Sequence, residues 1–403
     1  MNDRPPPPVP ALILLAASLL ACGGTEPEVP SPVTEPAVSA AVGVPHDGGM
    51  EPAEDVLYDR WESFGREQGF PSDKVLSVLP LPDETWAGTE NGLVRLKDGK
   101  VTVYGTADGL AHRVVTALAR SPATGDLWIG TLGGLSRLSG GRFRSWRQSD
   151  SGLVNDVVYD VAVTGERIWV ATAAGLGGFD TATGSWSLHD HTNAVFHEPW
   201  IYSVAPGGGA LWIGVWGGGV VAHDPVAGTW REFRDPDGEM ELELVADDGP
   251  VHDVTAGVSF ANGVLWQATY FGVSRLSGGR WRTFLSSTSP LPSDFVNAVH
   301  ASGRRAFLAT DSGLCVTDGD AWATYAHDGN GRPGIRITEP GGEERVVPLA
   351  AGPPHDFIYT ARATGRHVWV GTAAGLGHGW SPAGDRDGNR GASPGDGPER
   401  KER

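Results

Sequence analysis

The chain has 403 residues, of which 40% are aliphatic or aromatic, and it contains 15 Trp, 58 Gly and 30 Pro. This is enough apolar material for a large core, and the many Gly and Pro residues predict frequent tight turns. The formal net charge of −18 leaves no basic patch able to neutralise phosphates, so nucleic acid is not an expected partner. Cys22 and Cys315 lie in unlike segments and predict no disulfide framework; Cys315 is expected to be a small buried residue.

The first residues are typical of an export signal. Residues 11–21 form an apolar run too short to span a bilayer, and they end in Leu-Leu-Ala followed by Cys22. This ending resembles a bacterial lipobox, which implies cleavage before Cys22 and lipid attachment to it. Gly23 next to the lipid implies the outer membrane as the destination. The alternative is an ordinary secretory signal in which Cys22 stands by chance.

Pro-, Glu- and Gly-rich segments without apolar periodicity flank the central region. We expect residues 1–21 to be a signal peptide, 22–55 a lipid-anchored disordered tether and 381–403 a disordered tail. The folded domain is then confined to residues 56–380.

A repeated motif dominates this central region. Its commonest form is Trp-x-Gly/Ala-Thr followed, after two intervening residues, by Gly, and its seven copies start at Trp86, Trp128, Trp169, Trp212, Trp266, Phe307 and Trp369. The spacings between copies are 42, 41, 43, 54, 41 and 62 residues. A period near 40 with short alternating strands predicts an all-β fold, a seven-bladed β-propeller of four-stranded blades.

The seventh blade lacks its last strand, because the tail begins soon after its third strand ends at Trp380. A spare strand of the right type, residues 60–64, precedes the first copy of the motif. We expect this N-terminal strand to complete blade 7 and close the ring.

The motif resembles the repeat of the two-component-regulator propeller family, which occurs in sensor regions of hybrid histidine kinases and in stand-alone exported proteins. The resemblance covers residues 57–380. It implies a propeller fold, and it implies little about function.

Two columns of polar residues precede the first strands of the blades, where the loops of one face surround the channel. The second column contains Asp73, Asp156, Asp253, Asp294 and Asp356. We expect these carboxylates to accept hydrogen bonds from turn N–H groups, a structural role that a repeat copies into each blade.

The first column contains His112, Glu198, His252 and His355, whose side chains are ordinary ligands of a divalent metal. Their convergence on a cation at the channel mouth is one hypothesis. A chance series of polar loop residues is the other, because blades 2, 5 and 7 are not adjacent.

Blades 4 and 5 depart most from the repeat. Their turns between the second and third strands carry aromatic rings, and the segment before the first strand of blade 4 is His-Glu-Pro-Trp. Rings beside histidines and carboxylates predict a stacking platform for a sugar or peptide; the alternative is that the rings pack under the acidic insertion at residues 235–250. The candidate binding residues are His197, Glu198, Trp200, Trp216, His252, Asp253, Tyr270, Phe271 and His355.

A second insertion, residues 326–354, predicts a β-hairpin that projects from the same face. The stretch 328–332 within it has a weak similarity to a calcium loop.

Three functions are compatible with these features. The first is a non-catalytic, monomeric recognition module of the cell envelope that binds a small molecule or a protein at the channel face. The second is a metal-dependent lyase or hydrolase using the His/Glu column, as in other propeller families. The third is an architectural subunit of an envelope complex.

Overall fold

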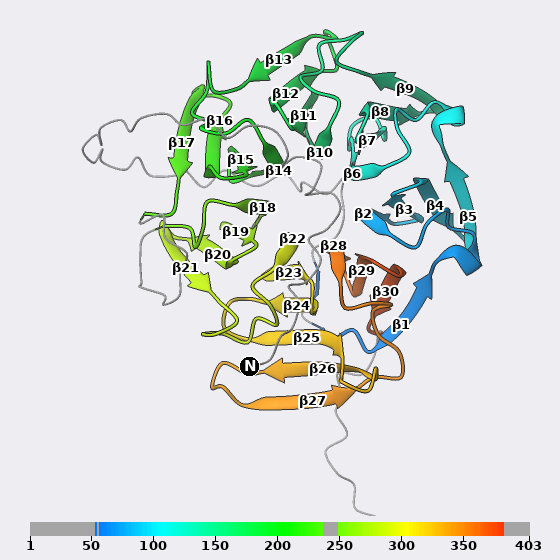
Figure 1. Ribbon diagram of the computed structural model, residues 1–403, viewed down its shortest axis with the longest axis vertical. Coiled ribbons are helices and arrows are strands. Elements are labelled where there is room, and N and C mark those ends of the chain that lie inside the picture. The colour runs from blue at the N-terminus through cyan, green and yellow to red at the C-terminus, as the bar shows by residue number, and fades with distance from the viewer. Residues whose placement is uncertain (1–52, 55, 237–248, 383–403) are drawn as a thin grey trace, which may run out of the picture. The chain divides into compact units, whose positions relative to one another are not determined.

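Seven antiparallel sheets form a ring of blades in the computed structural model (Figure 1). The structure describes residues 53, 54, 56–236 and 249–382, all of which belong to the compact unit Ala40–Arg403. Cys22 and the residues 237–248 of the first insertion lie outside the described residues. Among the described residues, no helix is long and apolar enough to cross a membrane.

The first three blades each run from an inner strand A to an outer strand D. Blade 1 comprises β2 (Val75–Leu81), β3 (Glu84–Thr89), β4 (Gly92–Lys97) and β5 (Lys100–Tyr104). Blade 2 comprises β6 (Val115–Arg120), β7 (Leu127–Thr131), β8 (Gly134–Ser139) and β9 (Arg142–Trp146). Blade 3 comprises β10 (Val158–Thr164), β11 (Arg167–Thr172), β12 (Gly175–Asp180) and β13 (Trp186–His189). Two 3-10 turns, η1 (Arg66–Gln68) and η2 (Thr106–Asp108), lie between successive blades.

The remaining blades follow in the same order. Blade 4 comprises β14 (Ile201–Gly207), β15 (Ala210–Val215), β16 (Gly219–Asp224) and β17 (Thr229–Phe233). Blade 5 comprises β18 (Thr255–Ala261), β19 (Val264–Thr269), β20 (Gly272–Ser277) and β21 (Arg280–Phe284). Blade 6 starts with β22 (Val296–Ser302), β23 (Arg305–Thr310), β24 (Gly313–Thr317) and β25 (Trp322–His327). Blade 7 comprises β28 (Ile358–Thr364), β29 (His367–Thr372), β30 (Gly375–Trp380) and β1 (Arg60–Phe64).

This strand order places loops on two opposite faces. We call the face with the B–C turns and the D–A connections the upper face, and the face with the A–B and C–D turns the lower face.

The ring closes as the repeat predicts. β1 pairs antiparallel with β30, and Trp61 stands opposite Gly379 in the register. The indole of Trp61 is 8% exposed, and its Nε1–H donates to the carbonyl of Tyr58 at 2.9 Å. A Cβ on Gly379 would lie 2.7 Å from this indole, so glycine is needed opposite the ring. The two ends of the domain are therefore held in one sheet.

The repeated motif has a local cause in the turn between strands B and C. In blade 1 the Thr89 hydroxyl donates to the Gly92 carbonyl at 2.9 Å and accepts from the Asn91 N–H at 3.0 Å. Gly92 has a φ of 137°, which disfavours a side chain. The same Thr-to-Gly hydrogen bond occurs in every blade but the fourth, where Val215 replaces threonine.

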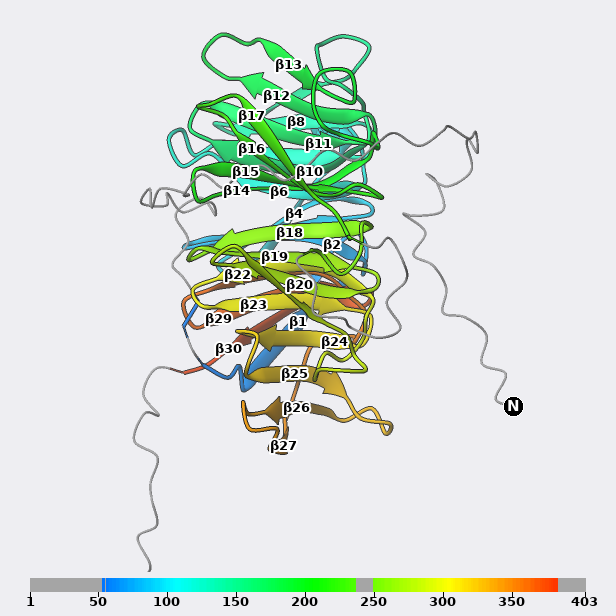
Figure 2. The same cartoon turned by 90° about the vertical axis from the view of Figure 1, so that its left-hand side faces the viewer.

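The hairpin of the second insertion forms, but its predicted position was wrong. β26 (Pro333–Thr338) pairs with β25, and β27 (Glu344–Pro348) pairs with β26, so blade 6 is a six-stranded sheet. Figures 1 and 2 show both strands continuing the blade outward rather than rising from the upper face. The unpaired backbone groups of β25 favour this addition, which also buries Ile335 and Ile337.

The calcium-like stretch closes a turn of this insertion. The Asp328 carboxylate accepts main-chain N–H groups of Asn330 and Arg332, and these bonds with the Arg332 side chain lower the pKa of Asp328 to about 2. Cys315 is fully buried, as expected, and burial raises the pKa of its thiol to about 12.

Candidate functional site

The column of aspartates has the structural role that the sequence predicts. Each carboxylate accepts a hydrogen bond from a main-chain N–H at the end of the preceding D strand or just beyond it. The donor-to-acceptor distances are 3.0 Å for Asp73, 2.7 Å for Asp156, 2.8 Å for Asp253, 2.6 Å for Asp294 and 3.1 Å for Asp356. These bonds tie each outer strand to the inner strand of the next blade.

The side chains of the first column also form hydrogen bonds within their own turns. The Nδ1 atoms of His112, His252 and His355 accept the main-chain N–H two residues further on, at 3.1, 2.9 and 2.8 Å. Ser72, Asn155 and Ser293 make the same turn with a side-chain oxygen. Each imidazole therefore carries its proton on Nε2 when it is neutral. Burial lowers the pKa of His112 and His252 and favours that neutral form.

The side chains of this column do not converge in the structure. Among the described residues, no three His, Cys, Asp or Glu side chains are close enough to hold a metal ion. Glu198 lies beside Gly217 of its own blade, while the three histidines are each held in a turn of a different blade. The hydrogen bond to Nδ1 holds each imidazole in the turn of its own blade. The side chains of the column therefore do not meet at one point.

A β-bulge in every A strand creates a third column, which the sequence analysis missed. The register skips one residue at the same point of each blade, and bulges of this kind redirect a side chain. The bulged residues are Leu76, Thr116, Tyr159, Tyr202, Ala256, Asn297 and Tyr359. Thr116 and Asn297 donate to carbonyls of the neighbouring A strands, at 2.7 and 2.8 Å. The column therefore lies along the inner strands, where adjacent blades meet.

Five aromatic rings form a continuous row across blades 3 to 6. Centroid distances are 4.3 Å for Tyr159–Tyr202, 4.8 Å for Tyr202–Trp216, 5.3 Å for Trp216–Tyr270 and 4.0 Å for Tyr270–Phe295. We call these five residues the aromatic row, and all of them are half-buried. Burial raises the pKa of its three tyrosines, so their hydroxyl groups stay protonated and are able to donate hydrogen bonds.

The rings of the predicted platform do not all lie together. Trp216 and Tyr270 belong to the row, but they are packed between channel residues that the sequence analysis did not select. Phe271 turns away and stacks on His252 at 4.0 Å. The main-chain carbonyl of Trp200 accepts the N–H of Trp216 at 3.0 Å, whereas His355 is exposed on blade 7.

A polar cluster borders the row at blades 4 and 5. His197 Nε2 lies 3.1 Å from a Glu232 oxygen, and Arg234 forms an ion pair with Asp253 at 2.9 Å. Trp216 connects the cluster to the row through an isolated bridge to Val254. The other Glu232 oxygen is buried and has no partner, and burial raises the pKa of Glu232 against the opposing effect of His197.

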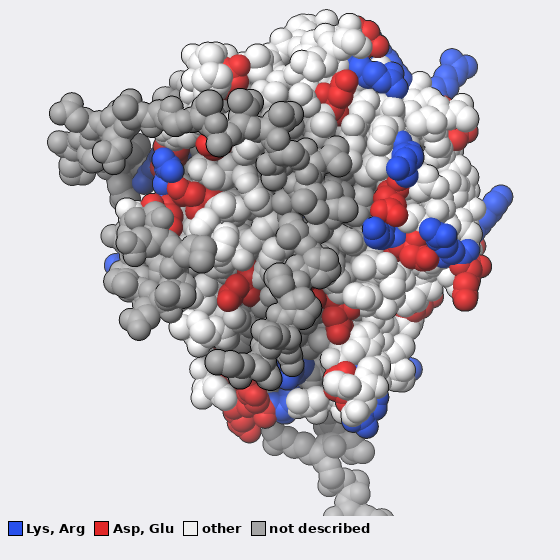
Figure 3. All heavy atoms as spheres, viewed as in Figure 1, with Lys and Arg blue, Asp and Glu red and all other residues white. Residues whose placement is uncertain are grey.

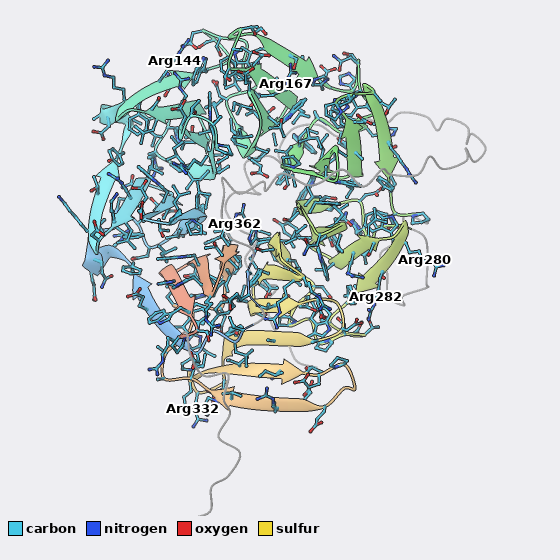
Figure 4. All side chains as sticks on the ribbon, turned by 180° about the vertical axis from the view of Figure 1, so that it is seen from behind. Arg144, Arg167, Arg280, Arg282, Arg332 and Arg362 are labelled. Carbon is cyan, nitrogen blue, oxygen red and sulfur yellow. The ribbon has the colours of Figure 1, made fainter. Side chains whose placement is uncertain are left out.

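A half-buried carboxylate joins two neighbouring inner strands. Asp160 accepts hydrogen bonds from the N–H of Val204 and the hydroxyl of Ser203, both in the next blade, at 3.0 and 3.1 Å. Burial raises its pKa, and the charge of Arg362 opposes this shift. Figure 4 shows Arg362 on β28 near the centre of the ring. On the face shown in Figure 3, acidic and basic groups are interspersed and most of the uncovered surface is neutral.

The missed residues do have a signal in the sequence. Tyr159, Tyr202 and Tyr359 each lie three residues after a member of the second column. Phe295 follows Asp294 directly. An alignment extended three residues into the A strands would have shown that aromatic residues are frequent at this position. It would not have shown the β-bulge that redirects their side chains.

Comparison with known proteins adds the fold family. No family model and no curated protein sequence matches the chain. The extracellular domain of the hybrid two-component system BT3049 from B. thetaiotaomicron matches with 15% identity and a TM-score of 0.59, over 79% of this chain and 41% of that one. The chain thus spans less than half of that structure's length.

Two further structures are similar over almost their whole length. Virginiamycin B lyase from Staphylococcus aureus has 14% identity and a TM-score of 0.56, covering 80% of this chain and 99% of that one. YCF48 bound to D1 peptide has 12% identity and a TM-score of 0.51, covering 82% and 98%. Identities this low establish the fold alone. The chain therefore has the seven-bladed propeller of the extracellular domains of two-component regulators, in agreement with the resemblance of its repeat to that propeller family.

Proposed function

We propose that this chain is a non-catalytic recognition module of the cell envelope that binds a sugar-like or peptide-like ligand along the aromatic row. The observation that carries the proposal is the row itself, in which five rings follow one another at centroid distances of 5.3 Å or less. The structural repeat alone does not require rings at the bulge positions of Tyr159 and Tyr202, since the equivalent positions of blades 1, 2 and 5 hold Leu76, Thr116 and Ala256.

The physical properties of the row suit a flat or extended ligand. Half-buried rings lose little conformational entropy on contact and offer faces to sugar rings, peptide planes or side chains. The protonated tyrosine hydroxyls and the bordering His197–Glu232 and Arg234–Asp253 pairs provide hydrogen bonds at the edge. The similar YCF48 structure contains a bound peptide, which supports the inclusion of peptides among the ligands to be tested.

The alternative of a metal-dependent lyase or hydrolase has less support, because its His/Glu column does not converge. An architectural role also has less support. The exposed large apolar side chains of the described residues, such as Val103, Leu188 and Val226, lie in different blades or turns rather than in one patch.

The direct test is a thermal-shift screen of the unlipidated chain from Gly23 onward with soluble oligosaccharides, peptidoglycan fragments and short peptides. A hit should be lost in Trp216→Ala, with affinity reduced at least tenfold if this central ring is an anchor. Trp186→Ala is the matched control, because Trp186 is a half-buried ring of the outer strand β13. Equal binding by the wild type and Trp216→Ala, with both folded, would contradict the proposal.

We also propose export and lipid anchoring through Cys22. The lipobox-like ending of the apolar run supports this proposal, and so does the extracellular location of the similar two-component domains. In a bacterial host, Cys22→Ser should abolish labelling by a palmitate analogue. Labelling that persists in this variant would rule out Cys22 as the anchor.

A further inference from the structure

Blades 1 and 2 share a three-part unit near the lower face. The strand-B tryptophan is covered by an arginine of strand C, with the guanidinium carbon 5.6 Å from the ring of Trp86 and 5.7 Å from that of Trp128. A carboxylate two residues before the tryptophan completes each unit. In blade 1, Glu84 accepts hydrogen bonds from Arg95 Nε at 2.7 Å and from the Trp86 indole at 2.8 Å.

The unit in blade 2 is looser but has the same composition. Arg137 reaches Asp126 through Nη1 at 3.7 Å, although its Nε is buried without a partner. In both blades, therefore, an arginine held over a tryptophan is neutralised by a carboxylate of its own sheet.

Blade 5 keeps two parts of the unit and lacks the third. Arg275 lies over Trp266 at 5.8 Å, as in blades 1 and 2. The position of the carboxylate is occupied by Val264. The Arg275 guanidinium forms no hydrogen bond or ion pair with any other residue that the structure describes, and its Nε is buried without a partner. A buried guanidinium nitrogen without an acceptor is unfavourable.

A cavity of about 230 Å³ adjoins this arginine on the lower face, between blades 5 and 6. Val264 and Trp266 line it together with charged groups of both blades, namely Arg275, Arg304, Arg305, Asp318 and Asp320. These lining groups sum to three positive and two negative charges, a net charge of +1.

The two aspartates of the cavity are already engaged. Asp320 pairs with Arg282 of β21 at 2.7 Å, and Asp318 accepts the N–H groups of Asp320 and Ala321. Figure 4 shows Arg282 on the outer part of blade 5. Arg305 donates to the Val56 carbonyl at 3.1 Å, so the unsatisfied donors of the lining are those of the Arg275 guanidinium.

We propose that this cavity binds the carboxylate of a small organic acid against Arg275 and Trp266, in the place that Glu84 fills in blade 1. The ligand completes the unit by accepting from the Arg275 guanidinium and the Trp266 indole. The volume is below the usual range of about 300–1,000 Å³ for drug-sized ligands, which limits the occupant to a compact acid. The site is on the face opposite the aromatic row and does not depend on it.

Succinate serves as the probe and succinamide as its uncharged counterpart, both titrated into the unlipidated chain at constant ionic strength. We expect succinate, and not succinamide, to raise the melting temperature. Arg275→Gln should weaken the response about tenfold or more, because a charged hydrogen-bonded partner is lost. Arg95→Gln is the matched control in blade 1, where Glu84 already occupies the position, and it should keep the full response to succinate.

A second pair of variants tests the site without a ligand. Val264→Glu supplies the missing carboxylate from the chain itself, so it should raise the melting temperature and abolish the response to succinate. Val264→Gln has nearly the same shape without the charge. It should raise the melting temperature less than Val264→Glu, and it should keep more of the response to succinate. The proposal is overturned if succinate shifts the wild type and Arg275→Gln equally, if it shifts neither, or if Val264→Glu and Val264→Gln behave alike.

Discussion

The closure of the ring between β1 and β30 can be tested with Trp61→Ala. The substitution removes a side chain that is 8% exposed, its contact with Tyr325 at 5.8 Å and its hydrogen bond to the Tyr58 carbonyl. Replacing a buried tryptophan by alanine costs about 3–5 kcal/mol. For a domain on the order of 300 residues the unfolding entropy is about 0.6 kcal/mol/K, so a loss of about 4 kcal/mol lowers the melting temperature by about 6 °C.

Calorimetry measures this shift, and hydrogen exchange shows where the protein opens. If β1 closes the ring, Trp61→Ala should increase exchange selectively in β30, whose outer edge β1 covers. Trp146→Ala is a matched control, because Trp146 is 5% exposed on the D strand of blade 2, which is continuous in sequence with its blade. It should lower stability without opening β30. Arg60→Ala changes an exposed side chain of β1 itself and should stay within about 0.5 kcal/mol of the wild type.

Two results would refute the reasoning. One is a Trp61→Ala melting temperature within about 1 °C of the wild type, because such a small change is incompatible with a buried ring at a closing seam. The other is equal protection of β30 in Trp61→Ala and Trp146→Ala, which would mean that the ring stays closed without this contact.

Burial lowers the pKa of His223 below 6.5, so the unfolded chain binds a proton more readily and stability should fall as the pH drops below about 6.5. His223→Phe keeps a flat ring on Trp230, where the imidazole stacks at 3.9 Å, and should reduce the loss of melting temperature between pH 7 and pH 5; an unchanged pH profile would contradict the assignment. Gly371→Ala should lower the free energy of unfolding, measured by urea titration, by about 1–3 kcal/mol, because the added Cβ would lie 2.5 Å from the Val75 carbonyl oxygen of blade 1. An unchanged free energy of unfolding would show that the two blades separate easily. Asp294→Ala removes an acceptor of two hydrogen bonds and should cost about 1–3 kcal/mol in the same assay, without a selective effect on ligand binding; a large loss of binding would instead give this column a functional role.

The sequence was sufficient for the features that depend on near neighbours along the chain. The threonine of the repeated motif forms a hydrogen bond with a glycine three residues further on, as Thr89 does with Gly92. Copies of the motif that contain this threonine therefore predict the same turn. The absence of a last strand in blade 7 followed from counting strands, and residues 60–64 were the available candidate. The hydrogen-bonding role of the aspartate column was also predictable, because a short carboxylate before a strand accepts from nearby main-chain N–H groups, although the donors lie at the end of the preceding D strand or just beyond it.

The tertiary structure alone decided which side chains meet. Tyr270 and Phe271 are adjacent in one turn, yet one stacks on Phe295 of blade 6 and the other on His252 of its own blade. The second insertion forms the predicted hairpin, but the free edge of β25 determined its direction. The histidines of the first column fit a metal by type, and their angular separation around the ring keeps them apart. A period near 40 residues defines each blade through local hydrogen bonds, whereas contacts between blades depend on the bulges and on the rotation from one blade to the next, which no single repeat encodes.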